Sequence, residues 1–167
     1  KQALKEPQKI AMGIVKPAHT VEHALYPVPQ HLKTKLLIEL LNRTDTNSVI
    51  VFTRTKHRAH RVSEQIKKAG FKATSLHGDR TQGQRQAAIK GFKSGTHDIM
   101  VATDIAARGL DIETVSHVIN FDMPDTADAY IHRIGRTGRA QRTGDAFTLV
   151  IEEDKDMIHT LERIVVH

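Results

Sequence analysis

The chain of 167 residues contains no cysteine and no tryptophan, and only 4% of its residues are aromatic. The lack of cysteine excludes disulfides, thiolate nucleophiles and cysteine-bound zinc, and it is compatible with a reducing compartment. So few aromatic residues argue against nucleic-acid binding on stacked aromatic platforms. No apolar run approaches the roughly 20 residues of a membrane span, and the Lys- and Gln-rich start lacks the apolar core of a signal peptide. We therefore expect a soluble, cytoplasmic protein with no membrane partner.

The residues that are present suit one compact domain with an excess of positive charge. Hydrophobic residues make up 39% of the chain, which is adequate for a core. The 25 Lys and Arg residues exceed the 19 Asp and Glu residues, for a net charge of +6. This balance favours a polyanionic partner such as nucleic acid, although charge alone decides little.

Short apolar runs alternate with helical patterns along the chain, which predicts an α/β fold with a parallel sheet covered by helices. Thr81 and Gln84 form a capping-box pattern, and Gly70 and Gly95 stand where two of the helices should end. The predicted strands span 48–53, 71–75, 98–102, 116–121 and 146–150. The predicted helices span 32–41, 59–69, 81–95, 126–134 and 153–165.

Residues 132–139 read His-Arg-Ile-Gly-Arg-Thr-Gly-Arg, with arginines at three-residue spacing. Guanidinium groups are always charged and present a planar fork of donors that fits phosphate oxygens. Gly135 and Gly138 allow the backbone to come close to a ligand. The octet therefore indicates phosphate binding, and a flexible basic loop without a specific ligand is the alternative for the octet in isolation.

Two further polar segments follow apolar runs and so belong at strand ends. Residues 103–111 follow the run 99–102, and His77-Gly78-Asp79 with Gln82-Gly83-Gln84-Arg85 follows the run 71–76. The carboxyl ends of strands are where open α/β sheets bind ligands.

Together with residues 49–56, and in this order, these segments resemble the second RecA-like domain of a DEAD-box RNA helicase. The resemblance runs from about residue 20 to about residue 150, and the wording of its motifs is most similar to the RhlE-type branch. It implies a RecA-like three-layer domain, with a mainly parallel sheet covered by helices on both faces. It also implies that residues 1–18 are an interdomain linker and the tail of a first domain, and that residues 19–167 form the helicase C-terminal domain.

The resemblance implies ATP with Mg²⁺ as cofactor, bound mainly by a first RecA-like domain. This sequence contains neither a Gly-x-x-x-x-Gly-Lys-Ser/Thr loop nor an Asp-Glu-Ala-Asp string, so we expect no ATP hydrolysis by the chain alone. By the family pattern, Arg136 and Arg139 act as arginine fingers that stabilise charge on the transferring phosphoryl group. They also contact the nucleotide, as do Gly109 and Asp111.

A second group of residues is expected, by the same resemblance, to link nucleotide state to RNA binding across the two domains. This group consists of His132, Arg133, Asp104 and Arg108. Two alternatives stay open: a purely structural role for His132, and an internal ion pair between Asp104 and Arg108.

The expected RNA contacts lie on another edge of the same face and involve the sugar-phosphate backbone, so binding should not depend on base sequence and should favour RNA over DNA. The candidates are Thr53, Arg54, Gly78, Asp79, Arg85 and Thr103. The whole protein is then expected to be an ATP-dependent RNA helicase that unwinds short duplexes. A stand-alone nucleic-acid-binding module and a DNA translocase of the same superfamily are the alternatives.

The segment His19-Thr20-Val21-Glu22-His23 matches the His-x-x-Glu-His form of an inverted zinc-peptidase motif, which requires a helix. Pro17, Pro27 and Pro29 instead predict an extended chain here. His57 and His60 share a helix face without an obvious third ligand. We therefore expect no metal site formed by this chain.

Overall fold

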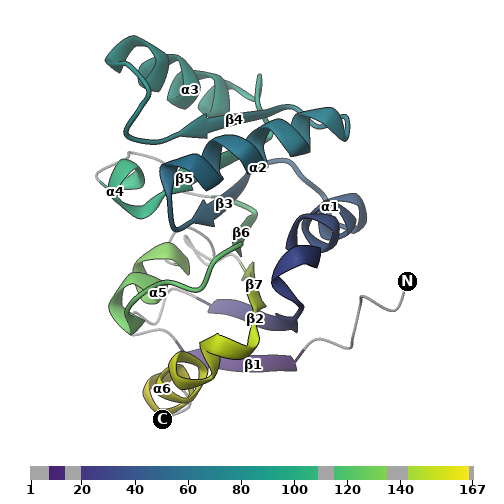
Figure 1. Cartoon of the computed structure of the whole chain (residues 1–167), viewed down its shortest axis with the longest axis vertical. Helices are drawn as coiled ribbons and strands as arrows, with labels where there is room; N and C mark the ends of the chain where they lie inside the picture. The colour runs from purple at the N-terminus through teal and green to yellow at the C-terminus, as the bar shows by residue number, and fades with distance from the viewer. Residues whose placement is uncertain (1–7, 14–19, 109–114, 135–142, 166–167) are drawn as a thin grey trace.

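The computed structural model describes residues 8–13, 20–108, 115–134 and 143–165 of the chain. Within these residues, a seven-stranded sheet has the order β1-β2-β7-β6-β3-β5-β4 (Figure 1). Every pairing in it is parallel except that of β1 with β2. The strands are β1 (Gln8–Gly13), β2 (Thr20–Pro27), β3 (Val49–Thr53), β4 (Ala73–Leu76), β5 (Ile99–Thr103), β6 (His117–Asn120) and β7 (Thr143–Val150).

Helices cover both faces of this sheet, which confirms the predicted α/β fold. The helices are α1 (Lys33–Arg43), α2 (Lys56–Lys68), α3 (Gln82–Ser94), α4 (Asp104–Ala107), α5 (Ala127–Ile134) and α6 (Lys155–Val165), with short 3₁₀ turns before α1 and α6. Strand β3 shows how the two faces divide, because side chains alternate along a strand. Val49 and Val51 are buried in the cluster that contains α1 and α2, whereas Ile50 and Phe52 belong to the cluster of α3 and α4.

The third cluster of buried side chains belongs to α5 and α6. Tyr130 and Ile134 of α5 and Leu161 of α6 pack there against Ala146 and Val150 of β7. Val118, which lies beside Ala146 in the sheet register, is part of the α3 and α4 cluster. Helices α3 to α6 therefore cover one face of the sheet, and α1 and α2 cover the other.

Residues 8–13 depart from the sequence-based expectation. The sequence predicts a linker over residues 1–18, but residues 8–13 form β1, which pairs with β2 from Gln8 opposite Leu25 to Gly13 opposite Thr20. A strand at the rim of a sheet gains its stability from the strand beside it and needs little pattern of its own. The assignment of the preceding residues to another domain stays a prediction.

The local signals for the helix ends were reliable. Thr81 and Gln84 form the predicted capping box of α3, at 3.1 and 2.9 Å. Gly70 and Gly95 follow α2 and α3 with φ of 100° and 86°, values at which any side chain other than hydrogen is strained. Helix α4, which no local sequence pattern predicted, is a single turn that begins directly at the end of β5 and is capped by Thr103.

Candidate functional site

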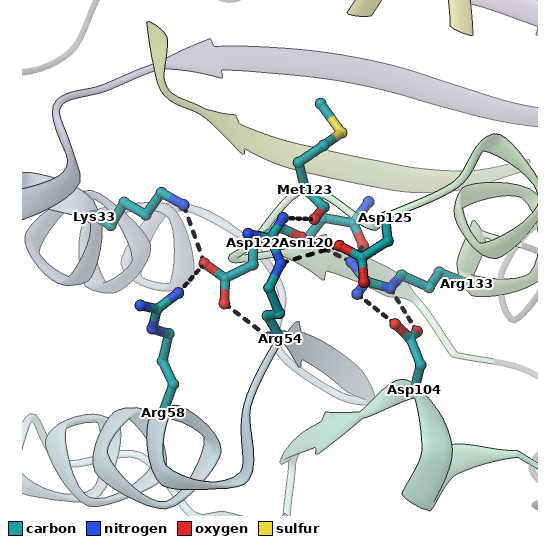
Figure 2. Close-up of polar contacts among 9 residues, drawn as sticks. All are labelled: Lys33, Arg54, Arg58, Asp104, Asn120, Asp122, Met123, Asp125 and Arg133. Atoms are coloured by element: carbon teal, nitrogen blue, oxygen red, sulfur yellow. Dashed lines mark hydrogen bonds and ion pairs between the residues drawn. The ribbon is translucent and has the colours of Figure 1, made fainter. Parts of the chain in front are cut away.

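The carboxyl ends of β6, β3, β5 and β4 meet at one edge of the sheet, because these four strands are adjacent and parallel. Polar residues follow each of them, and most of the residues predicted to carry function lie here. Figure 2 shows the two groups of polar contacts that organise this edge. One surrounds Asp122, just after β6, and the other surrounds Arg133 on α5.

Asp122 is a buried carboxylate that three basic residues approach. Its Oδ1 accepts from Arg58 Nη1 at 2.8 Å and from Lys33 Nζ at 3.2 Å, and its Oδ2 accepts from the backbone N–H of Arg54 at 2.8 Å. Arg54 also donates from Nη2 to the carbonyl of Met123 at 2.7 Å. These contacts join α1, α2 and the end of β3 to the end of β6, so they fix the backbone from which Arg54 projects.

The electrostatics keep Asp122 charged. Burial by itself would raise the pKa of this carboxyl, but the hydrogen bond from the Arg54 amide and the charges of Lys33 and Arg58 outweigh burial and hold the pKa below its ordinary value. Burial lowers the pKa of Lys33, and Asp122 opposes that shift. The sequence analysis did not single out Asp122, Lys33 or Arg58. The sequence signal for this group was that Asp122, a carboxylate, follows directly after an apolar run.

Arg133 is buried, with 2% of its side chain exposed, and it ties α5 to α4 and to β6. Its Nε and Nη2 donate to the two oxygens of Asp104, both at 2.7 Å, which is the bidentate geometry of a strong Arg–carboxylate pair. Its Nη1 donates to Asn120 Oδ1 at 3.0 Å and to the carbonyl of Asp122 at 2.8 Å. The guanidinium also lies 5.0 Å from the centre of the Phe52 ring.

This arrangement decides between the alternatives left open for Asp104 and Arg108. Asp104 does form an internal ion pair, but its partner is Arg133, 29 residues away, and not the neighbouring Arg108. The coupling role of Arg133 between two domains stays a prediction, and its side chain is enclosed within this domain. Its influence on another domain would have to act through the placement of α4 and α5. His132, the neighbour of Arg133 on α5, is exposed, and its Nδ1 lies 3.6 Å from the Asp128 carboxylate on the same helix.

The expected RNA-binding residues gather along the same edge. Arg54 follows β3, and its Nε lies 3.3 Å from Asp125. The exposed Gly78-Asp79 turn follows β4, and Asp79 pairs with Lys56 at the start of α2 at 3.0 Å. Arg85, in the first turns of α3, is half-buried.

The two threonines of the predicted RNA set support the backbone at this edge. Thr53 is fully buried and its hydroxyl donates to the carbonyl of Thr55, so in this structure that hydroxyl is not available to RNA. Thr103 is half-buried, and its hydroxyl accepts the N–H of Ala106 at 3.4 Å.

An open cleft of about 520 Å³ lies between α4 and α5. Among the described residues, its walls include Asp104 and Arg108 from the α4 side and Asp128, His132 and Arg133 from α5. Asp104 is paired with the buried Arg133, so these two charges offset each other. Asp128 and His132 are both exposed and lie 3.6 Å apart, which is an ion pair only when the imidazole is protonated. Arg108 is the exposed arginine among these five residues.

The predicted nucleotide ligands Gly109, Asp111, Arg136 and Arg139 lie outside the described residues. The chain enters their two segments from Arg108 and from Ile134, the last described residues of the α4 and α5 regions. Both segments thus continue from the two helices that border the cleft.

The His-x-x-Glu-His segment lies partly on β2, an extended strand, and not on the helix that a zinc peptidase requires. His23 is buried, and its Nδ1 shares a 2.8 Å hydrogen bond with the hydroxyl of Tyr130. Burial lowers the pKa of His23 to about 4 and raises the pKa of Tyr130 to about 12. The His23 ring is therefore a neutral part of the core.

A family model for the helicase conserved C-terminal domain matches residues 32–141. Among named relatives, the ATP-dependent rRNA helicase RRP3 of Kluyveromyces lactis is 48% identical over 146 residues, which cover 87% of this chain and 30% of the relative. The DEAD-box ATP-dependent RNA helicase CshA of Bacillus licheniformis is 45% identical over 136 residues, which cover 81% of this chain and 28% of the relative.

Solved structures agree. The DEAD-box protein SrmB of E. coli, crystallised with regulator of ribonuclease activity A, matches with a TM-score of 0.78 at 42% identity, over 87% of this chain and 84% of that chain. The yeast DEAD-box splicing factor Prp28 matches with a TM-score of 0.82 at 35% identity, over 90% of this chain and 34% of that chain.

The chain belongs to the helicase C-terminal domain family. Within it, the chain is the C-terminal RecA-like domain of a DEAD-box RNA helicase, as the resemblance implied. It spans about 30% of the length of the curated relatives it matches. Of the described helices, none is long and apolar enough to cross a membrane.

Proposed function

We propose that this chain is the second half of an ATP-dependent RNA helicase, which works on ATP and Mg²⁺ bound mainly by a preceding RecA-like domain. The relatives are named as ATP-dependent RNA helicases, and the chain spans only their C-terminal part. The sequence has no P-loop lysine and no Asp-Glu-Ala-Asp carboxylate, so the phosphate cradle and the metal ligand must come from elsewhere. Its own part is to add charge and RNA contacts when two domains close.

The observation that carries this proposal is the cleft between α4 and α5. The segment with Gly109 and Asp111 continues from one side of it, and the segment with Arg136 and Arg139 continues from the other. In this proposal the two sequence motifs, which lie 25 residues apart from Asp111 to Arg136, act together on one nucleotide. Because Asp104 is paired with Arg133, the exposed Arg108 is the charged donor that the described wall of the cleft offers to an incoming polyphosphate.

In this proposal, Arg136 and Arg139 stabilise negative charge on the transferring phosphoryl group. Asp111 accepts hydrogen bonds from the ribose hydroxyls, which a carboxylate can do without competing for phosphate. An arginine supplied in this way is worth about 10³ to 10⁵ in rate in related NTPases. His132 and Arg108 line the cleft and are exposed, so both can touch the other domain. Arg133 and Asp104 act as positioning residues behind them.

RNA is held along the neighbouring strand ends. Arg54, the Gly78-Asp79 turn and Arg85 offer guanidinium and backbone N–H donors of the kind that a sugar-phosphate chain accepts. Closure of the two domains would bend the bound strand and unpair a short duplex, because binding energy can be used to distort a substrate. The RhlE-type branch and a cytoplasmic location are further parts of the proposal, and both rest on the sequence.

The test uses the protein that contains both domains. Arg139→Ala and Arg136→Ala should each lower kcat for ATP by roughly 10² or more at saturating RNA, because a charge used mainly in the transition state affects rate more than binding. Arg163→Ala removes the same charge from an exposed position on α6, a helix that contributes no described residue to the cleft wall, and should keep the wild-type kcat. A wild-type kcat for Arg139→Ala would refute the arginine-finger assignment.

A further inference from the structure

Helices α2 and α3 give one end of the described molecule a large excess of positive charge. Helices α2 and α3 together carry eight Lys and Arg and one Glu, a net charge of +7, whereas the whole chain carries +6. Residues 152–163, which include most of α6, carry five Asp and Glu against two Lys and Arg. Figure 1 places α2 and α3 at the top of the molecule and α6 at the bottom. A polyanion in the surrounding solution is therefore drawn toward the end that holds α2 and α3.

Part of this charge forms a stripe along α2. His57, Arg61 and Lys68 are four and seven residues apart, so they share one face of the helix. That face lies opposite the buried residues Ala59, Val62 and Ile66. All three residues of the stripe are exposed. No acidic side chain among the described residues pairs with Arg61 or Lys68.

The stripe is distinct from the charges that serve the fold. Arg58, on the side of α2 toward α1, is committed to Asp122, and Lys56 pairs with Asp79. Glu64 is the one acidic residue of the helix, and it pairs with Lys67 at 3.2 Å. Glu64 lies on the same helix face as the stripe, three residues after Arg61 and four before Lys68, but its carboxylate is paired with Lys67. Arg61 and Lys68 therefore face solvent without a carboxylate partner among the described residues.

The stripe also joins the proposed RNA edge. Helix α2 begins at Lys56, two residues after Arg54, and Lys56 contacts the Gly78-Asp79 turn. From there α2 runs away from the edge. Between His57 and Lys68 the helix rises about 17 Å at 1.5 Å per residue. At about 3.4 Å per stacked nucleotide, that length corresponds to about five nucleotides of a single strand.

We propose that the His57–Arg61–Lys68 stripe is a second RNA-binding surface, which holds the phosphates of the strand where it leaves the carboxyl edge. This inference rests on the proposed function, because it extends the same bound strand. The ligand is a sugar-phosphate backbone, and the stripe reads no base. The surface lengthens the bound segment of RNA by about five nucleotides.

The experiment measures RNA binding by the chain of residues 1–167 with labelled single strands of five and fifteen nucleotides, at 50 and 200 mM salt. The test variant is Arg61→Glu/Lys68→Glu. The control is Lys35→Glu/Arg43→Glu, which makes the same change of charge at exposed positions on α1. Variants are compared at each RNA length, because a longer strand also offers more binding registers.

For the fifteen-nucleotide strand, the α2 variant should bind at least about tenfold more weakly than the control at 50 mM salt. The slope of log K against log salt should fall by about 1.4, which is two phosphate contacts at 0.7 each. For the five-nucleotide strand, the two variants should bind alike. The neutral variant Arg61→Gln/Lys68→Gln should show a smaller loss in the same direction, with an unchanged thermal unfolding curve.

Equal binding of the fifteen-nucleotide strand by the α2 variant and the control would overturn the inference. The stripe would then not bind RNA, and an acidic protein partner would be the alternative ligand. An equal loss of affinity for the five-nucleotide strand would also overturn the inference. The substitutions would then act on the RNA site at the carboxyl edge, or through the overall electrostatic field of the protein. The edge site is tested separately by Arg85→Ala on the five-nucleotide strand. Failure of that variant to weaken binding would count against the proposed function and not against the stripe.

Discussion

The ion pair between Arg133 and Asp104 offers the sharpest test of how this site is held together. Arg133 is buried and makes four hydrogen bonds to Asp104, Asn120 and the carbonyl of Asp122. Asp104 is more accessible, with 39% of its side chain exposed. Removing either residue leaves the other charge without its partner. Arg133 has less access to water than Asp104, so water compensates an unpaired Arg133 less well.

Removal of one partner of a buried pair typically costs about 3–5 kcal/mol of unfolding free energy. We expect Asp104→Ala to cost about 3 kcal/mol, near the lower end, because water can reach part of the space that the carboxylate leaves. We expect Arg133→Ala to cost about 4 kcal/mol, since it also leaves Asn120 and a buried carbonyl without their donor and removes the contact with Phe52. The double variant should cost clearly less than the sum of the two, because each single change removes the same pair.

Urea unfolding of the chain at pH 7, followed by circular dichroism, measures all three values. Asp128→Ala is the matched control: Asp128 lines the same cleft and pairs with His132, but both side chains are highly exposed, so its removal should leave the unfolding free energy almost unchanged. Strict additivity of Asp104→Ala and Arg133→Ala would refute the view that this pair couples α4 to α5.

Three further predictions address other parts of the molecule. Because His23 has a pKa of about 4 in the folded state and 6.5 as a model group, the unfolded state binds its proton first as pH falls. Stability should therefore drop by about 3 kcal/mol between pH 6.5 and 4, and His23→Phe should remove that part of the pH dependence of urea unfolding. Thr81→Ala should cost about 1 kcal/mol in the same assay through loss of the α3 cap, and no measurable cost would contradict the capping role. Arg85→Ala should weaken RNA binding and lower the salt slope by about 0.7, while RNA-free ATP hydrolysis by the two-domain protein stays nearly unchanged.

The sequence alone was sufficient for the fold class and for most of its elements. Buried parallel strands leave continuous apolar runs, so β3, β5 and β6 were visible from residue type alone. The ends of α2 and α3 were visible because capping boxes and left-handed glycines are local features. Strand β1 was missed because its stability comes from β2, which no local pattern encodes.

For the site, the sequence located the segments but not the partners of their side chains. It placed Arg54, Asp104 and Arg133 in functional motifs, and the structure does bring these motifs to one edge. It left open whether Asp104 forms an ion pair with Arg108, the nearest arginine along the chain, whereas the fold pairs Asp104 with Arg133 across the cleft. It gave no special weight to Asp122, because a carboxylate after a strand says nothing about which cations surround it.

What the sequence by itself determined is therefore the set of short-range facts: the strands with continuous apolar runs, the helix caps, the phosphate-type motifs and the absence of a P-loop. The tertiary structure decided which charges meet. The three basic residues around Asp122 come from α1, α2 and the end of β3, and the partners of Arg133 lie 11 to 29 residues away. Hydrogen bonds and ion pairs act over a few ångströms, and only the packing of helices on the sheet sets such distances between residues far apart in the chain.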